Sequence, residues 1–137
     1  MKNIICTVAG AVGGLIASVF GGCDAALLTL MIFMAADFTS GIIVAGVFHR
    51  SQKSANGALE SKAGWKGLSR KCMSLLFVLI AHRLDLLLGV NYIRCAVIIG
   101  FAANELISIV ENAGLMGLPL PAAVMRAVDV LKKKSEE

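Results

Sequence analysis

The chain has 137 residues, of which 58% are hydrophobic and 16% are charged, and its formal net charge is +4. A soluble domain usually carries about 25% charged residues, because polar surface has to cover its core. The composition therefore excludes an ordinary water-soluble globule and predicts an all-α integral membrane protein, with residues 1–137 forming a single membrane domain.

Four apolar stretches are long enough to be considered as transmembrane helices. A helix needs about 20 apolar residues to cross a hydrocarbon core about 30 Å thick. The stretches cover residues 4–20, 25–48, 72–90 and 92–110, and the first and last are near the short limit. We therefore predict about four transmembrane helices.

Small side chains dominate the first stretch and recur at every fourth position, which places them on one face of a helix. Such a face lets another helix backbone approach closely. The predicted helix-packing residues are Ala9, Gly10, Gly13, Gly14, Ala17 and Gly21, with Gly41 in the second stretch. Lys2 and the apolar run after it resemble a secretory signal. Because aromatic Phe20 precedes the glycines and another apolar stretch begins at once, we expect a retained first helix.

Polar side chains lie inside the other three stretches, where an unpaired charge costs about 2.5–3.5 kcal/mol. A rise of about 1.5 Å per residue places Asp37, Arg83 and Glu105 at one depth. We expect Arg83 to pair with Asp37 or Glu105 on another helix. Such a belt either fixes helix register as a buried ion pair or lines a water-filled space. The predicted intramembrane set is Asp37, His82, Arg83, Asp85, Asn104, Glu105, Ser108 and Glu111.

A basic loop over residues 49–71 holds six Lys or Arg residues and one acid, whereas the turns at 21–24 and 89–91 hold no Lys or Arg. Basic loops of this length stay in the cytoplasm, so we predict that the loop and both termini are cytoplasmic. Residues 61–71 suit either a short basic helix in the headgroup layer or a solvated loop. The tail, residues 119–137, is predicted to form an amphipathic cytoplasmic helix.

Anionic lipid headgroups are the expected partner of these basic residues, because no nucleic-acid recognition motif accompanies the charge. The predicted headgroup contacts are Lys62, Trp65, Lys66, Arg70, Lys71, Lys132, Lys133 and Lys134.

The four cysteines have no metal-binding spacing, and no catalytic or nucleotide-binding motif is present in the sequence. We therefore expect no enzyme activity, no metal and no cofactor. The predicted topology would allow a disulfide between Cys23 and Cys95, although packing as small apolar residues is the favoured role of both.

Several sequence segments match the motifs of one known family. Residues 34–41 contain Asp-x-x-x-Gly, residues 61–71 are the basic segment, residues 81–85 read Ala-His-Arg-Leu-Asp, and residues 103–121 contain Asn-Glu, Glu-Asn and Gly-Leu-Pro-Leu-Pro in that order. Together they resemble the phage holins of the toxin-secretion and phage-lysis type. The resemblance covers roughly residues 25–131, and its last segment is the most specific.

The resemblance implies a multi-pass protein of the bacterial cytoplasmic membrane that forms homo-oligomers and opens a timed lesion. The lesion would release an endolysin or a toxin without a required direct contact between the two proteins. The alternatives from the residues themselves are a small oligomeric ion channel or transporter subunit, which would use the same intramembrane charges, and a passive membrane scaffold.

Overall fold

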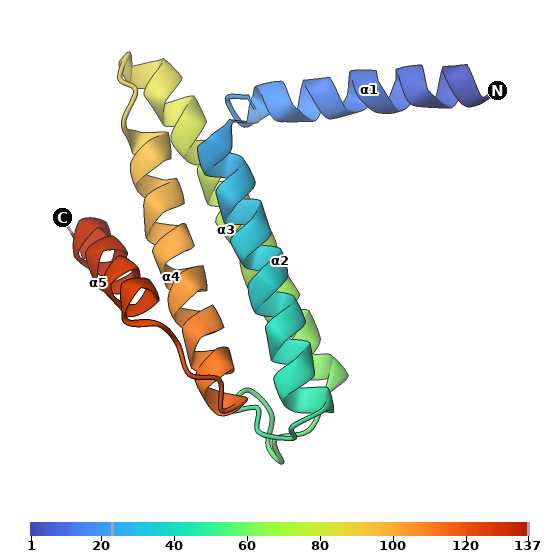
Figure 1. Ribbon diagram of the computed structural model, residues 1–137. Coiled ribbons are helices and arrows are strands. Elements are labelled where there is room, and N and C mark those ends of the chain that lie inside the picture. The colour runs from blue at the N-terminus through green and yellow to red at the C-terminus, as the bar shows by residue number, and fades with distance from the viewer. Residues whose placement is uncertain (23, 137) are drawn as a thin grey trace.

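The computed structural model describes residues 1–22 and 24–136 of the chain. This part of the chain forms helices and no strands (Figure 1), so the all-helical prediction is confirmed. The helices are α1 (Lys2–Val19), α2 (Ala25–Gly46), α3 (Ser61–Leu88), α4 (Ile93–Leu115) and α5 (Ala122–Glu136).

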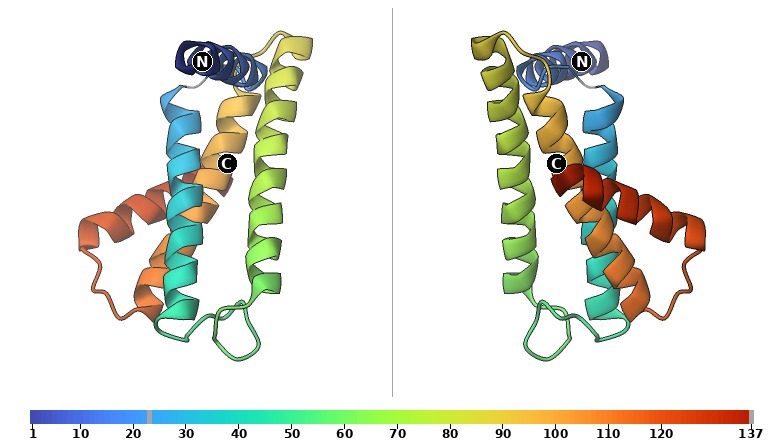
Figure 2. Two further views of the ribbon diagram at one scale, coloured as in Figure 1. Left: turned by 90° about the vertical axis from the view of Figure 1, so that its right-hand side faces the viewer. Right: turned by 90° about the vertical axis from the view of Figure 1, so that its left-hand side faces the viewer.

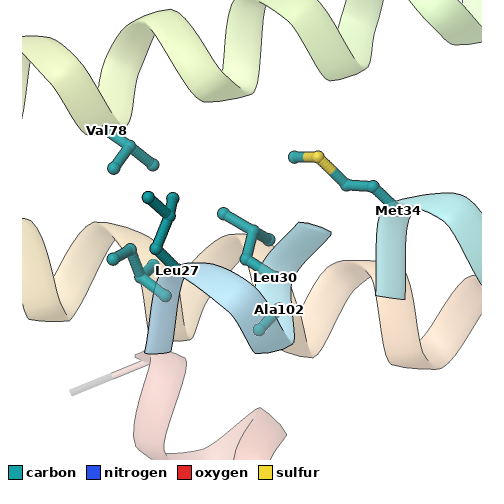
Figure 3. Close-up of a cluster of buried hydrophobic side chains, with 6 residues drawn as sticks. Leu27, Leu30, Met34, Val78 and Ala102 are labelled. Carbon is teal, nitrogen blue, oxygen red and sulfur yellow. The ribbon is translucent and has the colours of Figure 1, made fainter. Parts of the chain in front are cut away.

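Helices α2, α3 and α4 run alongside one another as a bundle (Figure 1). Helix α4 packs closely on both partners, whereas α2 and α3 contact each other less. The core, shown in close-up in Figure 3, is built from Leu27, Leu30, Met34, Val78, Ile98 and Ala102. These residues lie in the half of the bundle near the α3–α4 turn. In lipid, such a core stabilises the bundle mainly through van der Waals packing.

The outward faces of the bundle are apolar. Leu28 and Ile32 of α2 are 50% and 55% exposed, and Leu87 of α3 is 80% exposed. Soluble proteins rarely leave large contiguous apolar patches open to water. An exterior this apolar fits a surface that is covered by lipid.

Three helices are long and apolar enough to cross a membrane, namely α1, α2 and α4. Helix α3 is not among them, because its first turns are basic and its apolar part carries Arg83 and Asp85. The predicted count of four spans is therefore not confirmed.

The predicted helix boundary at residue 72 is wrong. Residues 61–71 do not form a separate short helix or a loop but are the first turns of α3, which runs for 28 residues. No proline interrupts the segment, so its backbone hydrogen bonds continue into the apolar part without a break.

Helix α1 lies across the end of the bundle (Figures 1 and 2), and none of its residues is buried. A Cβ atom added at Gly10, Gly13 or Gly14 would meet nothing within 4 Å, so the predicted packing face of α1 has no partner among the described residues. At Gly41, by contrast, an added Cβ would lie 3.8 Å from Asn112 Nδ2, where α2 approaches α4.

The tail forms α5 after the prolines at 119 and 121, and it packs on α4 (Figure 2). Proline suits the start of a helix, because the N–H that it lacks would have had no partner there. Val128 is buried, at 8% exposure.

Candidate functional site

The ammonium group of Lys71 lies between two carboxylates. Lys71 Nζ donates to Asp37 Oδ2 at 2.6 Å and to Glu105 Oε2 at 2.5 Å. The three side chains come from α3, α2 and α4, and are 12%, 6% and 9% exposed. We call this group the ion triad. It ties all three helices of the bundle together at one level.

Asn112 of α4 completes the surroundings of Asp37. Its amide Nδ2 donates to Asp37 Oδ1 at 3.2 Å and to Ser40 Oγ at 2.8 Å. A buried carboxylate needs both a cation and hydrogen-bond donors to offset its lost hydration. Asp37 has both, which explains how α2 keeps a carboxylate in an otherwise apolar helix. Asn112 is not in the predicted set, although the Glu111-Asn112 pair belongs to the motif quoted above.

An open cavity of about 410 Å³ adjoins the ion triad between α3 and α4. The polar stripe of α4 faces it through Asn104, Ser108 and Glu111, as the helical spacing of those residues predicts. Lys66 and Arg70 of α3 line the opposite wall. A smaller hollow of about 70 Å³ lies on the α2 side of Lys71. Asp37 and Lys71 line both hollows and therefore lie between them.

The predicted pairing of Arg83 with Asp37 or Glu105 is wrong. Arg83 is exposed, and no salt bridge involves it among the described residues. Because α3 begins at Ser61, Lys71 is already inside the helix and reaches the carboxylates. Arg83 lies twelve residues further on, about 18 Å along the axis. A lysine directly before an apolar run can bury its aliphatic stem. The position of Lys71 before the run that begins at Cys72 is the sequence feature that could have indicated its burial.

Asp85 and His82 lie near the opposite end of the bundle from Lys71, so the predicted single belt is two separate clusters. Asp85 accepts the backbone N–H groups of Ile93 at 2.9 Å and Arg94 at 3.0 Å, and thereby caps the start of α4. His82 lies against the α1–α2 turn, where a Cβ added at Gly21 would come within 2.7 Å of its Nδ1. Asp85 thus accepts hydrogen bonds from N–H groups that have no partner within α4, instead of pairing with a charged side chain.

Arg94, which the sequence patterns did not single out, holds the α1–α2 turn against α4. Its guanidinium donates to Phe20 O at 2.6 Å, Gly22 O at 3.1 Å and Asp24 Oδ2 at 2.8 Å. Asp24 also caps α2 by accepting the Leu27 N–H at 3.0 Å. The hydrogen bond from Arg94, then that from Leu27, lowers the pKa of Asp24 below its ordinary value of 3.8. An aspartate directly before an apolar run is a recognisable N-cap signal.

Of the two cysteines for which the topology would allow a disulfide or, as favoured, packing as small apolar residues, Cys23 lies outside the described residues and Cys95 is exposed. The residues that we expect at the headgroup layer are divided between two helices. Lys62, Trp65, Lys66 and Arg70 are exposed on α3, and Lys132, Lys133 and Lys134 are exposed on α5. Of this set only Lys71 is drawn into the bundle.

Comparison with known proteins identifies relatives over most of the chain. An uncharacterized protein of Listeria monocytogenes is 38% identical, with 91% of this chain and 84% of the relative aligned. An uncharacterized 14.9 kDa protein of Clostridium perfringens is 32% identical, with 98% and 99% aligned. A probable holin of Bacillus phage phi105 is 28% identical, with 74% and 70% aligned. No solved structure matches the chain.

The sequence model of the bacteriophage holin family matches residues 14–133. That range includes all of α2, α3 and α4, and therefore every side chain of the ion triad and of its cavity. The resemblance noted in the sequence is thereby confirmed, and the chain belongs to the bacteriophage holin family.

Proposed function

We propose that the protein is a holin that forms homo-oligomers in the bacterial cytoplasmic membrane and opens a timed lesion, through which an endolysin or a toxin leaves the cell. Its family and its similarity to a probable phage holin support this role, and the family is one of non-enzymatic membrane proteins. The observation that carries the mechanism is the ion triad, with Lys71 held between Asp37 and Glu105 beside an open polar cavity.

The position of the cavity gives a physical reason for assembly. In a single copy it is open at the surface, because Asn104 and Glu111 at its wall are exposed. Contact between such groups and hydrocarbon is costly. Copies that turn their cavities toward one another remove the polar walls from lipid and enclose water, while their apolar faces stay in contact with lipid.

Helix α1 supplies a second contact in this proposal. None of its residues is buried within the chain, and its small-residue face is open. Helices associate in lipid where small side chains let the backbones approach. Since association depends on protomer concentration, accumulation during expression sets the time at which the lesion opens.

We also propose an orientation of the bundle in the membrane. The loop between α2 and α3 and the first turns of α3 carry Arg50, Lys53, Lys62, Lys66, Arg70 and Lys71. By the positive-inside rule this end of the bundle faces the cytoplasm. The basic residues there, with those of α5, contact anionic headgroups. The endolysin or toxin needs only the opening, not a binding surface on this chain.

Induced expression in a bacterium that also makes a cytosolic cell-wall hydrolase tests the proposal. We expect a delay, then abrupt depolarisation and release of the hydrolase, with loss of culture turbidity. Expression of the chain without the hydrolase should depolarise the cells while turbidity stays high. An ion-selective current without release of the hydrolase would mean that the protein is an ion channel and not a holin. Accumulation of the protein in the membrane without depolarisation would support only a scaffold role.

A further inference from the structure

Three further cations line the cavity beside the ion triad, and the charge of one of them, Lys53, also acts on Asp37. Lys66 and Arg70 lie one helical turn apart on α3, and Lys53 reaches the same cavity from the α2–α3 loop. Among the described residues none of the three is in a salt bridge. Lys71, the fourth cation of the cavity, is already engaged. Like charges collected around one hollow favour the entry of an anion.

The cavity has room for a ligand because a residue without a side chain lines it between the two cations of α3. Gly67 lies between Lys66 and Arg70, and an added Cβ there would meet nothing within 4 Å. The volume, about 410 Å³, is in the range of about 300–1,000 Å³ that is usual for small-molecule sites.

An apolar hollow continues the cavity along the same two helices. It is lined by Phe77 of α3 and by Val97, Gly100 and Phe101 of α4, and its volume is also about 410 Å³. Asn104 lines both hollows, so they adjoin. Phe77 is about 9 Å further along α3 than Lys71, away from the basic end. A cationic cavity followed by an apolar hollow fits a molecule with an anionic head and a hydrocarbon chain.

We infer that the groove between α3 and α4 of a single copy, before copies assemble, binds one anionic phospholipid of the phosphatidylglycerol type. Its phosphate lies among Lys53, Lys66 and Arg70, and an acyl chain lies against Phe77 and Phe101. The inference rests on the proposed membrane placement and assigns a lipid class to one site. Basic pockets between membrane helices on the cytoplasmic side bind phosphate headgroups in this way.

The charges of the cavity favour a single phosphodiester. With all groups ionised, the four cations and the three carboxylates Asp37, Glu105 and Glu111 leave one positive charge. One phosphodiester neutralises it. The ammonium of a zwitterionic headgroup would instead meet the lysines. Glu111 lines the cavity without a salt bridge among the described residues and opposes the anion.

A tryptophan placed in the apolar hollow provides the test: Phe77→Trp is combined with Trp65→Phe, because Phe77 lines the hollow and Trp65 is the single tryptophan of the chain. The purified full-length protein with these two changes, which serves as the reference below, is reconstituted with brominated phosphatidylglycerol or brominated phosphatidylcholine of the same chains, and quenching of the tryptophan at position 77 gives the relative binding constant. We expect a preference of severalfold for phosphatidylglycerol. Since each cation near a headgroup contributes about 1 kcal/mol, Lys66→Gln or Arg70→Gln should lower the preference about fivefold.

Three further variants separate this site from general surface charge. Arg83→Gln removes the same charge from the same helix outside the cavity, and should leave the preference within twofold. Gly67→Leu keeps every charge but fills the hollow, and should abolish the preference. Glu111→Gln should raise it. Equal quenching by both lipids without a cavity substitution overturns the inference, as does a loss in Arg83→Gln as large as in Arg70→Gln.

A soluble competitor distinguishes a lipid site from a phosphate site. We expect millimolar glycerol phosphate to leave the lipid preference unchanged, and full displacement by it would overturn the lipid assignment. The lipid preference is measured on purified protein without lysis, so the lipid inference and the holin role can be contradicted independently of each other. A wild type that releases the hydrolase but has no lipid preference refutes only this inference, and one with the preference but no release refutes only the holin role.

Discussion

The carboxylate of Asp85 accepts the backbone N–H of Arg94 at 3.0 Å, and the guanidinium of the same Arg94 donates to Asp24 Oδ2 at 2.8 Å. One residue thus connects the end of α3, the start of α4 and the α1–α2 turn. Asp85 fixes the backbone of Arg94, so the direction of α1 depends on a cap located more than sixty residues away in the sequence.

Replacing Asp85 should destabilise the bundle through the start of α4. In Asp85→Ala, the N–H groups of Ile93 and Arg94 lose their acceptor, and loss of a helix cap costs about 0.5–2 kcal/mol. Thermal unfolding of the detergent-solubilised protein measures the change. Asp129→Ala, which removes an exposed aspartate from α5, is the matched control and should unfold like the wild type. Equal unfolding of Asp85→Ala and wild type would contradict the capping role.

Removing the cation of the ion triad should be more damaging. Lys71→Met leaves Asp37 and Glu105 as two buried carboxylates without a cation, and breaking a buried pair on one side costs about 3–5 kcal/mol. Adding Asp37→Asn and Glu105→Gln to Lys71→Met removes all three charges and should recover much of the stability. Unfolding temperatures of the single and triple variants test this. A triple variant no more stable than Lys71→Met would mean that charge is not the cause.

The time of lysis should depend on the triad carboxylates and not on Arg83. Asp37→Asn or Glu105→Gln changes the polarity of the cavity wall that we propose to face other copies, so the onset of turbidity loss after induction should shift. Arg83→Gln lies in the other half of the bundle and should keep the wild-type onset at equal protein level. Unchanged onset in both triad variants would remove the triad from the mechanism.

The clamp between Arg94 and Asp24 should loosen in acid. The hydrogen bond from Arg94 lowers the pKa of Asp24 in the folded state below 3.8. The ionised carboxylate therefore contributes stability above pH 3.8, and this contribution is lost as the pH falls through the lowered value. The effect is small, because the Asp24 side chain is 51% exposed. The protection of the amides at the start of α2, measured as hydrogen exchange relative to the unfolded chain at the same pH, should fall below pH 3.8 in the wild type and much less in Asp24→Asn.

Gly21 and Gly22 offer a matched pair for testing the α1–α2 turn. Both have positive φ angles, +86° and +91°, so alanine costs about 1–2 kcal/mol of backbone strain at either position. Only at Gly21 would the new Cβ also clash, 2.7 Å from His82 Nδ1. Gly21→Ala should therefore unfold at a lower temperature than Gly22→Ala, and His82→Ala should relieve the difference. Identical unfolding of the two glycine variants would contradict this packing.

The sequence by itself determined that the chain is helical, that it belongs in a membrane and which family it resembles. These properties depend on composition, on the length of apolar runs and on short motifs such as the one at residues 103–121, all of which are local. The positions of α2 and α4 and the polar stripe of Asn104, Ser108 and Glu111 follow from the same helical periodicity.

Only the tertiary structure decided which cation meets the buried carboxylates. Lys71 and Arg83 are both basic residues on α3, and the choice between them depends on where α3 starts and how it is shifted along α2 and α4. Asp85 caps α4 across a turn, and Arg94 holds a turn more than seventy residues away, so neither partnership is encoded by local spacing. The direction of α1 likewise follows from these contacts, because its own apolar sequence fits a helix that crosses the membrane as well as one that lies across the bundle.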